Sequence, residues 1–179
     1  MTRTRHAIAD DALIGRLLLR VAEDLGTLLG CELRLGPAHV ERATTRPAGA
    51  GMVHVSFRLA FTPEGEAPRL GALLLPLPEA LTMAAHFLMA PEEVLPTLRA
   101  ASGPDLAQKE ALLELGKMIA NAGRTALAQL GVSGLALRFD GCQGVRAGVR
   151  PAFDYTEGSP LIVGRAQAKI GGFPEFELV

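Results

Sequence analysis

The sequence has no Trp and a single Tyr, and aromatic residues make up 4% of its 179 residues. Proteins that stack nucleobases or cage cationic ligands need several aromatic side chains, so both classes are disfavoured. An excess of one charge is missing too, because 18 Lys and Arg stand against 19 Asp and Glu. General nucleic-acid binders carry a basic excess, so we expect no nucleic-acid partner.

Long apolar runs are also missing. The longest spans residues 70–78, which is far too short to cross a bilayer. The first apolar segment is interrupted by Arg16 and Arg20, unlike the core of a signal peptide. We therefore expect a cytoplasmic protein with no membrane partner.

The sequence has two cysteines and four histidines, too few and too scattered for a metal site. Neither Cys31 nor Cys142 stands in a CxxC pair, and no His lies three or four residues from another ligand. We expect no metal and two reduced, buried or half-buried thiols, although the sequence leaves a disulfide between them open.

Apolar residues make up 49% of the chain and charged residues 21%, which is enough for one packed domain. Apolar spacings of three and four predict helices, and alternation predicts strands. Helices are predicted at 11–29, 78–89 and 105–130, and strands at 31–42, 52–61, 69–77, 135–139, 161–169 and 173–178. This order predicts an α+β fold in which helices pack on a mostly antiparallel sheet. Residues 1–10 are expected to form a tail, and residues 11–179 a single domain.

The strand at 52–61 has the clearest alternation in the sequence. Val53, Val55 and Phe57 begin the apolar face, and His54 belongs to the opposite one. This pattern predicts a half-buried strand whose second face, including His54, meets solvent or an interface.

The helix at 105–130 has two contrasting faces. Its small apolar face contains Gly116 and Gly123, and each mid-helix glycine costs about 1 kcal/mol relative to alanine. We therefore expect another backbone to pack closely there. Polar residues at spacings of 4-3-4-3 share the opposite face: Glu110, Glu114, Lys117, Asn121 and Arg124. On its own, this stripe is typical of a solvated surface with a Glu114–Lys117 ion pair.

Residues 114–127, with the sequence ELGKMIANAGRTAL, resemble the signature helix of the CheC/CheX chemotaxis phosphatase family. That signature has an Asp or Ser, then a Glu four residues later and an Asn three residues after it, followed by small residues. The order of elements over residues 11–179 is also similar to CheX. The resemblance implies a CheX-like α+β fold that includes this long helix.

The motif departs from the family pattern. Glu114 matches the acid, whereas Glu110 stands at the first position and Lys117 at the Asn position. The family's downstream Pro has no counterpart near Asp140. The first predicted helix has no ExxN, so the resemblance is to the single-site CheX arrangement.

In this family the helix is thought to enter the active site of a phosphorylated CheY-like receiver. The Glu pairs with the receiver's lysine, and the Asn orients the attacking water. An amide both accepts and donates hydrogen bonds, whereas Lys only donates, so Lys117 cannot hold the water in the same way. Asn121 lies one turn further on and would replace the amide only if the helix docked about 6 Å displaced.

Three hypotheses follow from the resemblance. In the first, the chain binds a receiver domain or related signalling protein and its phosphatase activity is lost or altered. In the second it is an active response-regulator phosphatase that uses Glu114 with Lys117 or Asn121. In the third it is a structural module like those of the flagellar switch.

The resemblance also sets the expected partners. Glu114 and Lys117 take the catalytic positions, and Glu110, Asn121 and Arg124 are expected to contact the partner. No cofactor is expected, because the receiver would carry the Mg²⁺. CheX-like domains pair through sheet edges, so we expect a homodimer in which residues 53–61 offer the edge.

Overall fold

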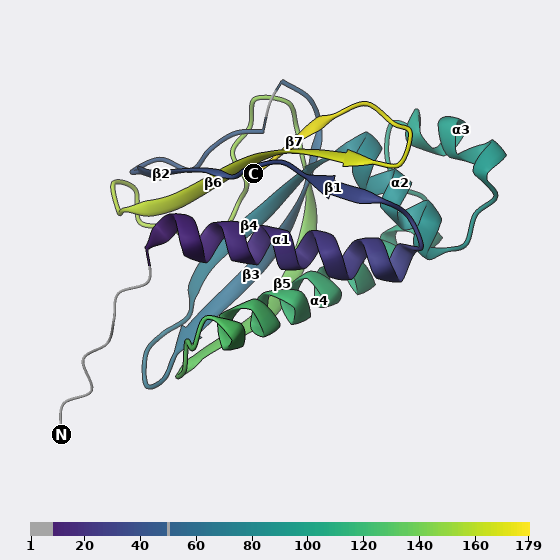
Figure 1. The fold of residues 1–179 in the computed structure, drawn as a ribbon. Coiled ribbons are helices and arrows are strands. Elements are labelled where there is room, and N and C mark those ends of the chain that lie inside the picture. Colours follow the sequence, from purple (N-terminus) through teal and green to yellow (C-terminus); the bar gives the residue numbers. More distant parts are fainter. Residues whose placement is uncertain (1–8, 50) are drawn as a thin grey trace.

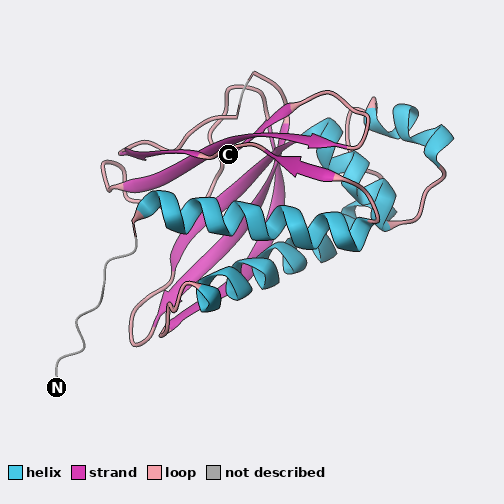
Figure 2. Cartoon of the chain, viewed as in Figure 1, coloured by secondary structure: helices cyan, strands magenta, loops and turns pink. Residues whose placement is uncertain are grey.

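The computed structural model describes residues 9–49 and 51–179. Helix α1 (Asp10–Leu29) is followed by β1 (Leu33–Leu35), β2 (His39–Ala43), β3 (His54–Pro63) and β4 (Arg69–Pro76). Next come α2 (Leu77–Phe87), the 3-10 turn η1 (Glu92–Val94), α3 (Leu95–Arg99) and the long α4 (Leu106–Gln129). The chain ends with β5 (Leu135–Val145), β6 (Leu161–Ile170) and β7 (Phe176–Leu178). Figures 1 and 2 show α1 and α4 side by side against the strands. The predicted α+β class is confirmed.

The strands form two antiparallel groups. Strand β3 lies between β4 and β5, and β6 pairs with β1, β2 and β7. Strands β1 and β2 form one strand along β6 that is interrupted around Gly36 and Pro37. The groups meet where Val179, next to β7, exchanges both backbone hydrogen bonds with Leu74 of β4, at 2.7 and 3.3 Å.

The helices follow the predicted periodicity closely. Helix α1 buries Leu18, Val21 and Leu25, and ends at Gly30, whose φ of 60° is the left-handed cap expected of glycine. At its last turn Leu29 is buried, whereas Leu28 is 47% exposed. The main core lies between α1, α2, α4 and the two strand groups.

Two expectations for the 52–61 segment are wrong. Strand β3 is central in its group, so its backbone offers no free edge for a partner. His54 is 2% exposed, with its Nδ1 atom 2.6 Å from the carbonyl oxygen of Met52 and its ring against Gly49. The first half of β3 is therefore buried on both faces, and Gly49 lies against the face predicted to meet solvent.

Candidate functional site

Helix α4 carries the predicted stripe, and its start is fixed by local hydrogen bonds. The Asp105 carboxylate accepts from the backbone N–H of Gln108 at 2.8 Å, and the Gln108 side chain accepts from the Asp105 N–H at 2.9 Å. This reciprocal pair is a capping box, which satisfies two N–H groups that the helix itself leaves unpaired. The cap sets where the helix starts.

The two mid-helix glycines seat α4 on strand β5. A Cβ atom at Gly116 would overlap the ring of Phe139, and one at Gly123 would overlap the Leu137 side chain. The close approach predicted for these glycines is real, but the expected partner was wrong: side chains of β5, not another backbone, occupy the space. The small face is thereby buried and the opposite face points outward.

All five polar residues of the stripe are exposed on that outward face. We call this set the α4 ridge: Glu110, Glu114, Lys117, Asn121 and Arg124. The buried neighbours Leu112, Leu115 and Ile119 confirm that the helix divides as its spacing predicted. The structure thus brings every predicted site residue onto one surface, although their roles stay predictions.

The ridge residues bind one another in two pairs. Lys117 Nζ donates to Glu114 Oε1 at 2.6 Å, and both side chains remain about half exposed (61% and 48%). Arg124 donates to the Asn121 amide oxygen at 3.0 Å and reaches the carbonyl of Leu137 at 3.4 Å. One lone pair of the Asn121 amide oxygen is therefore occupied, which leaves the second lone pair and the NH₂ group for a partner.

The described residues contain no cluster of three or more His, Cys, Asp or Glu side chains able to hold a metal ion. Cys31 and Cys142 are both free and half-buried. Burial raises the pKa of each thiol, and for Cys142 the charge of Arg58 opposes part of that rise. Across residues 9–49 and 51–179, no helix is both long and apolar enough to cross a membrane.

No family model matches the sequence, and no curated protein matches it either. Solved structures do match in fold. FliY from Thermotoga maritima superposes with a TM-score of 0.68 at 15% identity, covering 99% of this chain and 90% of that one. CheX from Desulfovibrio desulfuricans gives 0.56 at 16% identity, with 93% and 95% covered.

The chain has the CheC/CheX fold. The middle domain of FliM from Vibrio alginolyticus shares it, with a TM-score of 0.56 at 9% identity over 93% of this chain and 88% of that one. At such identities the likeness establishes the CheX-like architecture alone, so the activity has to be argued from the α4 ridge.

Proposed function

We propose that this CheX-like domain binds a phosphorylated CheY-type receiver through the α4 ridge, with phosphatase activity lost or altered. The observation that carries the proposal is the ridge itself: in a CheC/CheX fold, Glu114 and its neighbours stand exposed on one helix face. The Mg²⁺ of such a complex would belong to the receiver, and this chain would need no cofactor.

The Glu114–Lys117 pair supports binding over hydrolysis. Lys117 is a cation that would face an anionic phosphoryl group, which favours association. It also holds the Glu114 carboxylate that, by resemblance, would pair with the receiver's lysine. A lysine offers only donors, so no atom of Lys117 accepts a hydrogen bond from an attacking water.

Active hydrolysis through Asn121 is the second candidate. A water held in line needs the amide oxygen as acceptor, and Arg124 already donates to that oxygen at 3.0 Å. The second lone pair of that oxygen can still accept from a water, so the remaining requirement is the one-turn displacement of the helix. This displacement disfavours the phosphatase function relative to binding.

A flagellar-switch-like structural role is the third candidate, and the FliY and FliM structures favour it. Binding through the ridge and assembly into a larger structure use different surfaces. A receiver that fails to bind, together with capture of the protein in a stable multiprotein assembly, would favour this function.

The test is the dephosphorylation and binding of a receiver from the same genome. Its spontaneous loss of phosphate is timed with and without this protein, and its affinity is measured with beryllofluoride in place of the phosphoryl group. We expect no acceleration, binding that depends on beryllofluoride, and at least tenfold weaker binding for Lys117→Glu. Glu66→Ala, at an exposed hairpin position, is the matched control.

Equal binding by Lys117→Glu and wild type would refute the ridge as the interface. Acceleration that is lost in Glu114→Ala would instead support the phosphatase candidate.

A homodimer remains part of the proposal, but its edge must differ from the expected one. Strand β5 lies at the outer end of its group and is 11 residues long, so it offers a backbone edge that β3 does not. Light scattering at two concentrations measures the oligomeric state, and a monomer at both would remove the dimer.

A further inference from the structure

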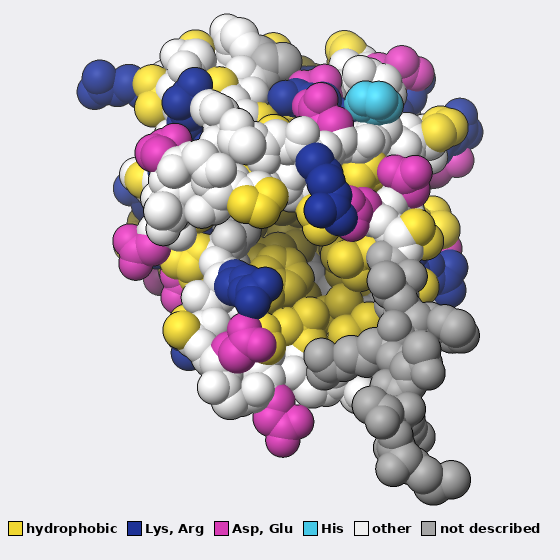
Figure 3. All heavy atoms as spheres, turned by 90° about the vertical axis from the view of Figure 1, so that its left-hand side faces the viewer, with side chains coloured by type: hydrophobic (Ala, Val, Ile, Leu, Met, Phe, Trp, Pro, Cys, Tyr) yellow, Lys and Arg dark blue, Asp and Glu magenta, His cyan; other side chains and the backbone are white. Residues whose placement is uncertain are grey.

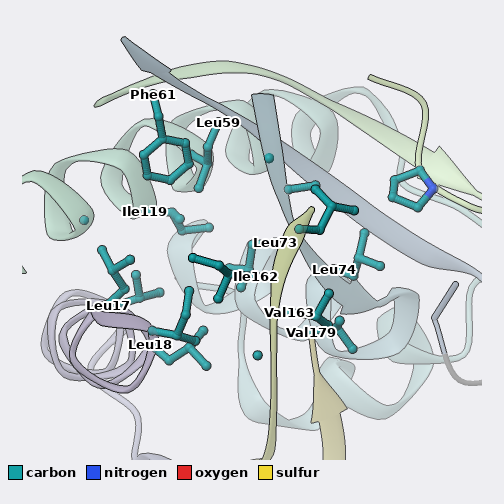
Figure 4. A pocket seen from close by; sticks show the side chains of 18 of the residues that line it. Leu17, Leu18, Leu59, Phe61, Leu73, Leu74, Ile119, Ile162, Val163 and Val179 are labelled. Atoms are coloured by element: carbon teal, nitrogen blue, oxygen red, sulfur yellow. The ribbon is translucent and has the colours of Figure 1, made fainter. Parts of the chain in front are cut away.

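An apolar cleft opens between the two strand groups, away from the α4 ridge. Its volume is about 180 Å³, and Figure 3 shows it as a hollow floored by hydrophobic side chains. Helices α1 and α4 contribute Leu17, Leu18 and Ile119, and strands β3, β4 and β6 contribute Leu59, Leu73 and Ile162 (Figure 4). No side chain that lines this inter-sheet cleft is charged.

The cleft begins where strand β7 stops. Beside β7 and Val179, the strands β4 and β6 are one strand apart, because Val179 bonds to Leu74 and Leu178 pairs with Ala166. Further along, residues 71–74 of β4 and 161–164 of β6 line the same cavity. Within the described chain, no strand lies between these two stretches.

Both stretches direct backbone hydrogen-bonding groups into the cleft. Leu74 uses its N–H and C=O toward Val179, so by alternation Ala72 and Leu70 direct theirs to the same edge of β4. On β6, the Gln167 carbonyl accepts from Gly36 on the β1 side.

By the same alternation, Ile162 and Gly164 direct their backbone groups to the opposite side, into the cleft. Neither stretch has a strand partner on this edge within the described residues. Unpaired edges of this kind are templates for an added strand.

The two open edges share one register. A segment extended in line with β7 would first stand beside Gly164 and Leu73, and its next residue would stand beside Val163 and Ala72. Its N–H and C=O groups would point alternately to β6 and β4. The backbone groups of these strands that point into the cleft alternate in the same order.

The side chains of such a segment would meet apolar surfaces on both faces. The lining includes Leu17 and Ile119 from the helices and Pro151 and Phe153 from the segment before β6. A cavity of roughly 150 Å³ holds one benzene ring, so this one has room for one or two small apolar side chains. A charged residue would find no partner there.

Two residues that line the cleft, Pro151 and Phe153, are held in place before anything binds. Arg46 donates to the carbonyl of Pro151 at 2.9 Å and to Glu157 at 3.0 Å. Its guanidinium also lies 5.6 Å from the ring centres of both Phe153 and Tyr155. A prearranged wall lowers the ordering cost of binding.

From the open edges and the uncharged lining, we propose that the inter-sheet cleft is a strand-addition site. Its occupant is an extended, uncharged segment of a partner polypeptide with small apolar side chains, inserted between β4 and β6 in line with β7. This site is separate from the α4 ridge and does not depend on the function proposed for that ridge.

The test uses a synthetic peptide of alternating Val and Thr with a Lys pair at one end for solubility. Binding is followed by amide NMR shifts and by hydrogen exchange. We expect exchange at Leu70, Ala72, Ile162 and Gly164 to slow at least tenfold at saturation. The control peptide has the same side chains with alternate backbone nitrogens methylated, and it is expected to protect none of these amides.

Two variants locate the site. Ile162→Asp places a charge at a lining position that is 41% exposed in the free protein, and we expect at least tenfold weaker peptide binding. Met89→Asp, at a position 89% exposed and outside the lining, is the control and should bind as the wild type does.

A second measurement avoids dependence on the free peptide's affinity. Val-Thr-Val-Thr fused after Val179 is expected to raise the melting temperature and to protect the same amides, whereas Gly-Ser-Gly-Ser is not. Absence of protection with both peptide and fusion overturns the proposal. Equal protection by the methylated peptide or by benzene also overturns it, because the cleft would then accept any apolar molecule.

Discussion

Gly116 of α4 lies directly against the ring of Phe139 on β5, with no room for a side chain between them. This contact brings the helix close to the strand and, together with Gly123 against Leu137, turns the polar ridge outward. The glycines are therefore part of how the fold presents the ridge, even though neither is exposed.

Gly116→Ala is expected to destabilise the protein. Overpacking against Phe139 costs about 1–3 kcal/mol, which outweighs the gain of up to about 1 kcal/mol in helix propensity. The free energy of unfolding in urea measures the difference.

Gly15→Ala is the matched control, because Gly15 also lies within a helix but has nothing within 4 Å of the added Cβ. It is expected to stabilise the protein by up to about 1 kcal/mol. The same sign of change in both variants would contradict the packing argument.

Lys117→Asn would place an amide at the position where the CheC/CheX signature has one. We expect the rate of receiver dephosphorylation to rise at least about tenfold over wild type, since an oriented water replaces a cation that cannot accept a hydrogen bond. Stability should change by less than about 0.5 kcal/mol, because the Glu114–Lys117 pair is exposed.

The measurement compares phosphate release from the receiver with wild type, Lys117→Asn and Lys117→Ala. If Lys117→Ala accelerates release as much as Lys117→Asn does, removal of the cation is sufficient and the amide has no positioning role.

The helices and most strands could be predicted because their signals are local. The spacing of apolar residues in 11–29 and 105–130 gave α1 and α4 to within a residue at each end. The 4-3-4-3 spacing also placed the ridge on one exposed face. What it did not predict is the Arg124–Asn121 hydrogen bond, which depends on the side-chain conformation of Arg124 and its contact with the carbonyl of Leu137.

The wrong expectations concern contacts between distant segments. Alternation assigns His54 to one face of β3 but does not say what covers that face, where Gly49 lies against the His54 ring. The inter-sheet cleft was also missed, because it arises where β4 and β6 diverge beyond Val179. The sequence feature that could have indicated the cleft is the apolar run from Leu161 to Val163. Such a run is typical of a strand with apolar residues on both faces.

Glu79 and Arg99 form a buried ion pair between α2 and α3, with side chains 5% and 17% exposed. Arg99 also donates to Thr82 and lies over the ring of Phe173 at 4.9 Å. Glu79→Ala should cost about 3–5 kcal/mol, because it leaves the Arg99 charge buried without its partner.

Calorimetric unfolding of Glu79→Ala and of the double variant Glu79→Met/Arg99→Met tests this. The double variant is expected to regain most of the loss, since no charge stays unpaired. Glu66→Ala, which removes an exposed partner of Arg69, should change stability by less than about 0.5 kcal/mol. Similar losses for Glu66→Ala and Glu79→Ala would contradict the role of burial.

The two thiols should react slowly and only at high pH. Burial raises the pKa of Cys31 and Cys142. At a given pH, each is therefore present as the reactive thiolate to a smaller extent than a free cysteine, whose pKa is about 8.5. Because the folded state holds the thiol protons more tightly, their stabilising contribution is complete below the unfolded pKa and is lost as pH rises through the folded one.

Alkylation by iodoacetamide, followed by mass spectrometry at each cysteine between pH 7 and pH 10 (about the span of the free thiol's titration), should give midpoints above that of an unfolded control. Arg58→Gln should move the Cys142 midpoint higher still and leave Cys31 unchanged, since the Arg58 charge lowers only the Cys142 pKa. A Cys142 midpoint that falls in Arg58→Gln would show that the guanidinium does not stabilise the thiolate.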